Sequence, residues 1–141
     1  MASALVSKVE TTEQKILGFD FDPGVTSLVD IGWESFANFG SFLVMFFRTI
    51  GTGATALNIL SNTAADGSGT DFEVKANTYV GGEPDLTGDY VFDECLAEEC
   101  NGNIGISAQV SVATGTDEAV IIYVMGRPRF SQLDLTADSI A

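Results

Sequence analysis

Oxygen-bearing side chains gather in one short, turn-forming segment of the chain. They are Asp66, Ser68, Thr70 and Asp71. Calcium binds oxygen ligands, and side chains spaced two residues apart around a tight turn are the arrangement that a calcium loop uses. The segment lacks the later bidentate glutamate of an EF-hand, and no helices are expected to flank it. We therefore expect a plain Asp-Gly turn and no bound metal, with these four residues as the metal candidate to test.

Carboxylates also cluster around the two cysteines of the chain. The acidic residues are Asp93, Glu94, Glu98 and Glu99, and a neighbouring segment adds Glu83, Asp85 and Asp89. A glycosidase needs two carboxylates that face each other across a cleft, whereas most acidic runs are solvated loops. Four residues separate Cys95 from Cys100, which is not the C-x-x-C spacing of a redox site or a zinc knuckle. We expect a solvated acidic loop beside two thiols that behave as small hydrophobic side chains.

The chain contains no histidine. The commonest general base is therefore missing, and neither Ser-His nor Cys-His nucleophile pairs nor histidine-containing metal sites can form. We predict no catalytic residues and no cofactor, and hence a protein that is not an enzyme.

Acidic residues outnumber basic ones by 20 to 6, and the formal net charge is −14. Nucleic-acid binding needs Lys and Arg to neutralise phosphates, and anionic membranes attract the same residues. We therefore expect neither nucleic acid nor membrane as a partner. The paired positive charges of Arg127 and Arg129 are followed by Phe130. They could hold a carboxylate of a neighbouring subunit, and two ordinary surface arginines are the alternative.

The elements that must position these residues have the two-residue period of β-strands. In residues 104–112 every second side chain is apolar and the others are glycine, serine or glutamine. Residues 119–125 follow after a short glycine-containing loop, so the two runs predict a β-hairpin. Residues 71–80 alternate in the same way. Further candidate strands are 16–21, 25–31, 54–61 and 90–92.

Residues 41–50 are apolar on both faces, which predicts a central strand covered on both sides. A helical alternative stays open for residues 33–47, because aromatic side chains recur there every three residues. Gly40 and the aromatic and β-branched content favour a strand in the second half. We interpret the aromatic stretch as core, and expect one short helix around residues 94–100.

About eight short strands with glycine-rich turns predict an all-β fold, either an antiparallel β-sandwich or a jelly-roll-like barrel with extended termini. We expect one domain over residues 11–130, an N-terminal arm over residues 1–10 and a C-terminal tail over residues 131–141. The composition is 45% hydrophobic but only 18% charged, against roughly 25% charged in a typical soluble domain. This excess of apolar residues favours a homo-oligomer, with a well-packed monomer as the alternative.

The first eight residues lack the basic and apolar regions of a signal peptide, and the longest apolar run, 42–47, is too short to span a bilayer. We therefore expect a protein that is made in the cytoplasm and keeps its cysteines reduced.

Several segments of the C-terminal half resemble a family of small virion proteins. They are GDYVFDEC (88–95), SAQVSVATGTDEA (107–119), MGRPRF (125–130) and LTAD (135–138). Together they resemble the head decoration, or cement, proteins of tailed bacteriophages, and the resemblance spans residues 54–141. It implies a β-rich, often trimeric protein that binds the major capsid protein on the outer face of an icosahedral shell.

We therefore expect a protein of the outer capsid surface, assembled in the host cytoplasm, that staples adjacent capsid subunits. The expected contact residues are Leu5 and Val6 in the arm and Arg127, Arg129 and Phe130 after the last strand, because both segments are ends of the core and one is the basic patch. One alternative is another virion component, such as a head-tail connector or a tail-tube protein. A calcium- or carbohydrate-binding β module is the other.

Overall fold

The computed structural model describes residues 13–20, 28–51, 53–112 and 118–128. Within these ranges the chain forms two antiparallel sheets that pack face to face, which confirms the predicted all-β sandwich. In chain order the elements are β1 (Glu13–Asp20), β2 (Val29–Asp30), β3 (Glu34–Ser35), β4 (Phe39–Ile50), β5 (Ala54–Asn62), β6 (Asp71–Glu83), β7 (Tyr90–Leu96), the 3-10 turn η1 (Ala97–Glu99), β8 (Gly105–Val112) and β9 (Glu118–Pro128).

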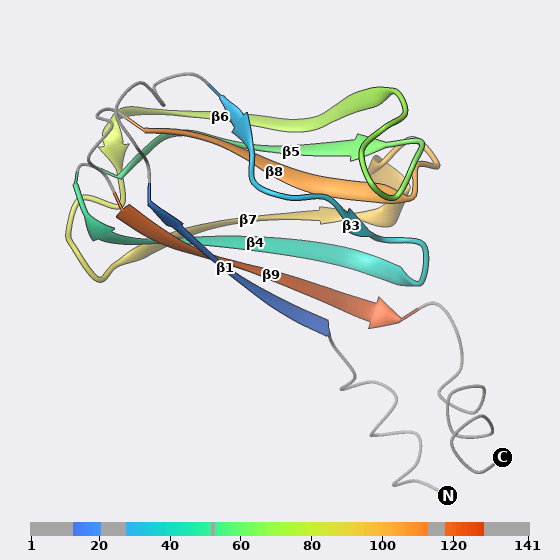
Figure 1. Cartoon of the computed structure of the whole chain (residues 1–141), viewed down its shortest axis with the longest axis horizontal. Coiled ribbons are helices and arrows are strands. Elements are labelled where there is room, and N and C mark those ends of the chain that lie inside the picture. The colour runs from blue at the N-terminus through green and yellow to red at the C-terminus, as the bar shows by residue number, and fades with distance from the viewer. Residues whose placement is uncertain (1–12, 21–27, 52, 113–117, 129–141) are drawn as a thin grey trace, which may run out of the picture.

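Figure 1 shows the two layers, with β5, β6 and β8 above β1, β4, β7 and β9. Sheet A, the lower layer, has the strand order β1-β9-β4-β7. Sheet B has the order β2-β8-β5-β6, and β3 also pairs with β8. The long strands β4 and β9 lie side by side in the middle of sheet A, and β6 and β7 form edges of the two sheets.

The hairpin predicted for residues 104–112 and 119–125 is wrong. Both segments are strands, but β8 pairs with β5 in sheet B while β9 pairs with β4 and β1 in sheet A. Each strand buries one apolar face, and placing the two strands in opposite layers turns both faces into the same core. Alternation predicts a strand and its buried face, but not which strand lies beside it.

The core between the sheets is built by every second residue of four strands. The large side chains that are at most 1% exposed on these strands are Phe42, Val44, Phe46, Leu57, Ile59, Ile106, Val110, Val112, Ile121, Tyr123 and Met125. Burying each such side chain stabilises the fold by about 1.5–3 kcal/mol. Phe42 packs edge-on against Tyr123, with ring centroids 4.9 Å apart. The interpretation of the aromatic stretch as core is thus confirmed for Phe36, Phe42 and Phe46, which are buried.

The two helical expectations are corrected by the structure. Residues 33–47 form β3 and most of β4, so the strand interpretation holds and the helical alternative is wrong. Near residues 94–100, β7 continues through Leu96 and only the single turn η1 is helical. Cys95 is 1% exposed because it still belongs to β7 and points into the core.

A β-bulge divides β6 and breaks the simple alternation predicted for residues 71–80. Leu60 pairs with Glu73 but its neighbour Ile59 pairs with Lys75, so Val74 is an extra residue in the ladder. The extra residue exchanges the two faces of the strand. Beyond it, Lys75 and Asn77 point toward sheet A, while Val80 is fully exposed.

Candidate protein-binding face

The oxygen-bearing side chains of the candidate metal loop build the turn between β5 and β6. The Oδ1 atom of Asp66 accepts hydrogen bonds from the N–H and the hydroxyl of Ser68, at 3.0 and 2.7 Å, and these bonds lower the pKa of Asp66. Asp71 accepts a 2.6 Å bond from the amide of Asn62, and Thr70 donates its N–H to Thr63. Such bonds are those of an ordinary Asx-type turn.

Asn62 holds this loop from inside, because its side chain is fully buried. Its Oδ1 atom accepts from the N–H groups of Ala64 and Gly69, and its amide also donates to the carbonyl of Gly67. Gly67 has a φ of +77°, and a Cβ atom there would lie 2.4 Å from the ring of Trp33. In the described part of the chain, no three acidic or cysteine side chains gather closely enough to hold a metal ion.

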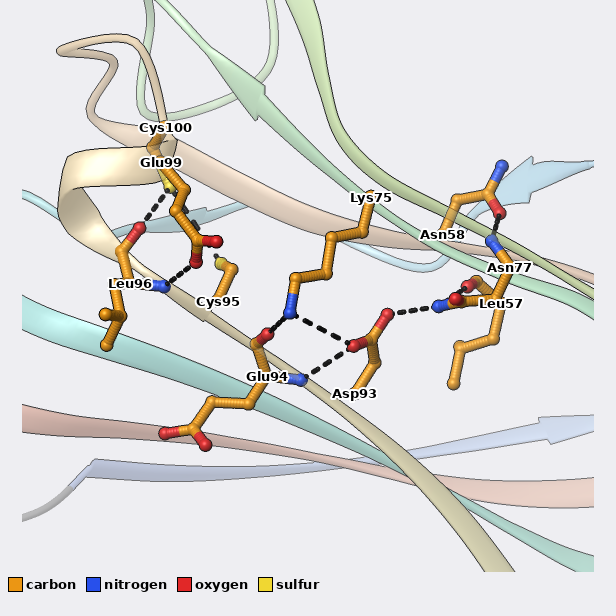
Figure 2. A network of polar contacts seen from close by, with 10 residues as sticks. All are labelled: Leu57, Asn58, Lys75, Asn77, Asp93, Glu94, Cys95, Leu96, Glu99 and Cys100. Atoms are coloured by element: carbon orange, nitrogen blue, oxygen red, sulfur yellow. Dashed lines mark hydrogen bonds and ion pairs between the residues drawn. The ribbon is translucent and has the colours of Figure 1, made fainter.

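The acidic cluster near the cysteines is partly structural, as Figure 2 shows. Asp93 of β7 forms a 3.5 Å ion pair with Lys75 of β6 and accepts hydrogen bonds from the amide of Asn77 and from the N–H of Glu94. Lys75 also donates to the carbonyl of Glu94, and Asn77 to that of Leu57. These contacts join the edge strands of the two sheets, so Asp93 closes one side of the sandwich.

The two thiols of Cys95 and Cys100 lie 3.9 Å apart and are both buried. The contact with Cys100 and burial raise the pKa of Cys95 above its ordinary value. A thiol with a raised pKa forms little thiolate and is a poor nucleophile. This environment agrees with the interpretation of the cysteines as packing residues.

The carboxylates of the neighbouring segment, Glu83, Asp85 and Asp89, line an open pocket at the start of β7. Its walls are Glu83, Pro84, Asp85, Leu86, Asp89, Tyr90 and Val91, and its volume is about 520 Å³. The buried side chain of Arg48 reaches this loop and donates to the carbonyl of Asp85. This contact ties the acidic loop to β4.

Of the predicted contact residues, the structure describes only Arg127. Its side chain is exposed, and it lines a second open pocket with Glu98 from the loop after β7. Leu5, Val6, Arg129 and Phe130 lie outside the described residues. The structure therefore leaves the predicted contact surface untested.

Sequence reasoning missed an apolar surface on the outer side of sheet A, which we call the outer face. It consists of Leu43, Met45, Phe47, Tyr90, Phe92, Val120, Ile122 and Val124. The register places these residues in rows across β9, β4 and β7, with Ile122 beside Met45 and Met45 beside Phe92. Tyr90 and Phe92 are 49% and 59% exposed, and the other six side chains are half-buried.

Aromatic contacts hold the β7 border of the outer face together. The ring of Tyr90 lies 5.0 Å from that of Phe47 and 6.4 Å from that of Phe92, measured between centroids. The sequence contains a signal for this face, because residues 41–50 and 119–125 have apolar side chains on both sides of the strand. The sequence predicts that residues 41–50 form a strand covered on both sides, whereas in the structure only the inner side is fully covered. An exposed apolar surface of this kind is a candidate site for contact with another molecule.

No helix in the described part of the chain is long and apolar enough to cross a membrane. No protein-family model matches the sequence, and no curated protein matches it significantly.

Several solved structures align with the chain at low identity. A Bacillus endospore appendage protein, from a family of disulfide-linked pili, is 10% identical with a TM-score of 0.42, over 83% of this chain and 88% of that one. The SPBc2 prophage-derived protein YomS is 11% identical with a TM-score of 0.45, over 84% and 97%. VP2 of the infectious bursal disease virus subviral particle is 8% identical with a TM-score of 0.47, over 83% of this chain but only 32% of that chain. Likenesses as loose as these carry no weight for what the chain does.

Proposed function

We propose that this chain is a non-enzymatic structural protein of a virion, a decoration protein that binds the outer surface of a phage capsid and staples adjacent major capsid subunits. The observation that carries the proposal is the outer face of sheet A. Eight apolar side chains lie together on one side of the sandwich, and two of the three aromatic ones, Tyr90 and Phe92, are about half exposed. Protein partners cover such surfaces, and the aromatic residues are the side chains that anchor interfaces most often.

Two further features support the proposal. The sequence segments 88–95, 107–119 and 125–130 resemble those of head decoration proteins. The net charge of −14 suits a protein that lies outside the shell, away from the packaged DNA. The mechanism is additive, because many weakly bound copies each add contacts that must break before the shell can rupture.

Binding to shells tests this function directly. The purified chain is mixed with empty, expanded shells assembled from the major capsid protein of the same genome, and the shells are then sedimented. We expect the chain to sediment with the shells at a fixed stoichiometry and to raise the temperature at which they rupture. A chain that stays in the supernatant at every concentration would contradict the proposal.

The alternative virion roles differ in their assembly. A head-tail connector or a tail-tube protein forms rings or tubes, so a six-fold ring in solution would favour those roles over decoration. The resemblance, taken alone, implies a trimer for a decoration protein.

A further inference from the structure

The apolar area of the outer face is large enough for a stable interface. Tyr90 and Phe92 are 49% and 59% exposed, which leaves roughly 200 Å² of open aromatic surface, because such side chains bury about 150–250 Å² each. With the six half-buried neighbours, the open apolar area is on the order of 400 Å², as large as the main apolar patch of a typical monomer. Since interfaces are about 60% apolar, two such faces in contact would bury roughly 1,300 Å² in all, above the ~1,000 Å² of a specific interface.

The distribution of charge indicates which kind of partner can bind the outer face. The chain has a net charge of −14, so two copies repel each other in most orientations. Among the described side chains of β4, β7 and β9 that share the outer face, the one charged residue is Glu94, at the border beside Leu43. Asp93 of β7 is turned inward to Lys75 and Asn77 of sheet B. Further described carboxylates near β7 lie beyond the strand ends, at Asp85, Asp89, Glu98 and Glu99. Over β4, β7 and β9, the outer face is therefore a surface on which two copies can meet with few opposing carboxylates.

We propose that the outer face of sheet A binds the outer face of a second copy of this chain, so that two sandwiches pack back to back about a two-fold axis. This inference goes beyond the proposed function, because it assigns the outer face to self-association and leaves the remaining surface of the pair for shell binding. Both copies use the same residues, as a two-fold interface requires. Two twisted sheets pack face to face at about 10 Å in this way inside every β-sandwich.

The register fixes the centre of the interface. Met45 lies on the middle strand of the three and in the middle row, between Ile122 and Phe92. The two-fold axis passes close to Met45, and the side chains of Tyr90 and Phe92 meet the partner near the β7 border. A carboxylate introduced into this face enters the interface twice, once from each copy.

Light scattering after size-exclusion chromatography tests the inference with matched variants. Phe92→Asp places a carboxylate in the outer face, and Phe72→Asp makes the same change on β6 in the other sheet, where the phenylalanine is 40% exposed. We expect the mass of two chains for wild type and for Phe72→Asp, and the mass of one chain for Phe92→Asp. Circular dichroism and melting of both variants confirm that each is folded.

Three results would overturn the inference. They are a monomeric wild-type chain at all concentrations, a Phe92→Asp variant that stays dimeric, and a trimer. A trimer requires a contact that is not two-fold symmetric.

Shell binding separates this inference from the proposed function. A wild-type monomer that still binds shells would overturn the two-fold pair and leave the decoration role standing. A dimer that Phe92→Asp dissociates, but that binds no shell, would support the pair and remove the decoration role.

Discussion

A single hydroxyl group ties the two sheets together inside the core. The phenol oxygen of Tyr123, on β9 of sheet A, accepts a 2.8 Å bond from the N–H of Ala108 on β8 of sheet B. The same hydroxyl donates to the carbonyl of Gly32, at 3.2 Å. Burial raises the pKa of Tyr123 to about 12. The group that joins the layers is therefore also one whose ionisation opposes folding.

We expect Tyr123→Phe to lower the free energy of unfolding by about 1–3 kcal/mol at neutral pH, because the buried N–H of Ala108 loses its partner. The pKa of Tyr123 rises from 10.0 to about 12 on folding. The unfolded tyrosine therefore ionises first, and wild-type stability falls as the pH rises between these values. The difference in free energy of unfolding between wild type and variant, which we call the gap, should therefore narrow as the pH rises over this range. Urea unfolding of both proteins at pH 8 to 11.5 measures the gap, and a constant gap would contradict this assignment.

The candidate metal loop shows which local contacts of a residue can be predicted from the sequence and which cannot. The expectation of an Asp-Gly turn at Asp66 follows from local chemistry, and the structure confirms the turn. The role of Asn62 could not be predicted, because its partners reach as far as Gly69 and Asp71 and depend on how the loop folds back. Local patterns indicate turns, whereas buried polar partners depend on the tertiary fold.

Edge strands β6 and β7 are joined by polar contacts rather than by apolar packing alone. Asp93 of β7 is the centre of these contacts, and its side chain is only 14% exposed. Its neighbour Glu94 is exposed and points away from the core. The two adjacent acidic residues therefore differ in role because strand alternation turns them to opposite faces.

We expect Asp93→Ala to lower the free energy of unfolding by about 2 kcal/mol, because Lys75, Asn77 and the N–H of Glu94 all lose a charged acceptor. Glu94→Ala is the matched control, and as a surface change it should stay within about 0.5 kcal/mol of wild type. Chemical denaturation of the two variants measures the difference. Equal losses from both variants would show that the cross-sheet contacts do not stabilise the sandwich.

Most strands could be predicted from the sequence, but their pairing could not. The alternation in residues 104–112 correctly indicates the buried side of β8, from Ile106 to Val112. The alternation could not show that β8 and β9 lie in opposite sheets. Two alternating strands can pair in one sheet or can face each other across the core, and the pattern is the same in both cases. The bulge at Val74 was equally hidden, since one extra residue leaves no mark in composition.

At the scale of the whole molecule, the described part of this acidic protein carries a nearly uncharged apolar face on β4, β7 and β9. The apolar excess in the composition, with 45% hydrophobic and 18% charged residues, predicts a homo-oligomer. The exposed apolar outer face agrees with that prediction, which stays to be tested by the assembly state in solution. The sequence predicts contact sites at the ends of the core, which stays a prediction, and the structure adds the apolar outer face on β4, β7 and β9. A strand that is apolar on both sides can be buried on both sides, or it can leave one side open for binding. Only the packing of the folded protein distinguishes these two cases.

Salt should strengthen self-association of this protein. Two chains of charge −14 repel each other, and the range of that repulsion falls from about 10 Å at 0.1 M salt to about 3 Å at 1 M. The apolar contact between outer faces is not weakened by this screening. We expect sedimentation equilibrium to give a several-fold tighter dimer in 1 M than in 0.1 M sodium chloride. A weaker dimer at high salt would indicate an interface made of ion pairs.

Peroxide oxidation of Met45 tests most directly whether the outer face is where this protein meets other proteins. Met45 lies half-buried at the centre of that face, and Met125 is 1% exposed in the core and reports on the integrity of the fold. Peptide mass spectrometry follows both residues in dilute protein, in concentrated protein and in protein bound to shells. We expect Met45 to oxidise readily in dilute protein and several-fold more slowly when the protein is assembled, while Met125 stays protected throughout. Equal oxidation of Met45 in all three states would contradict this expectation.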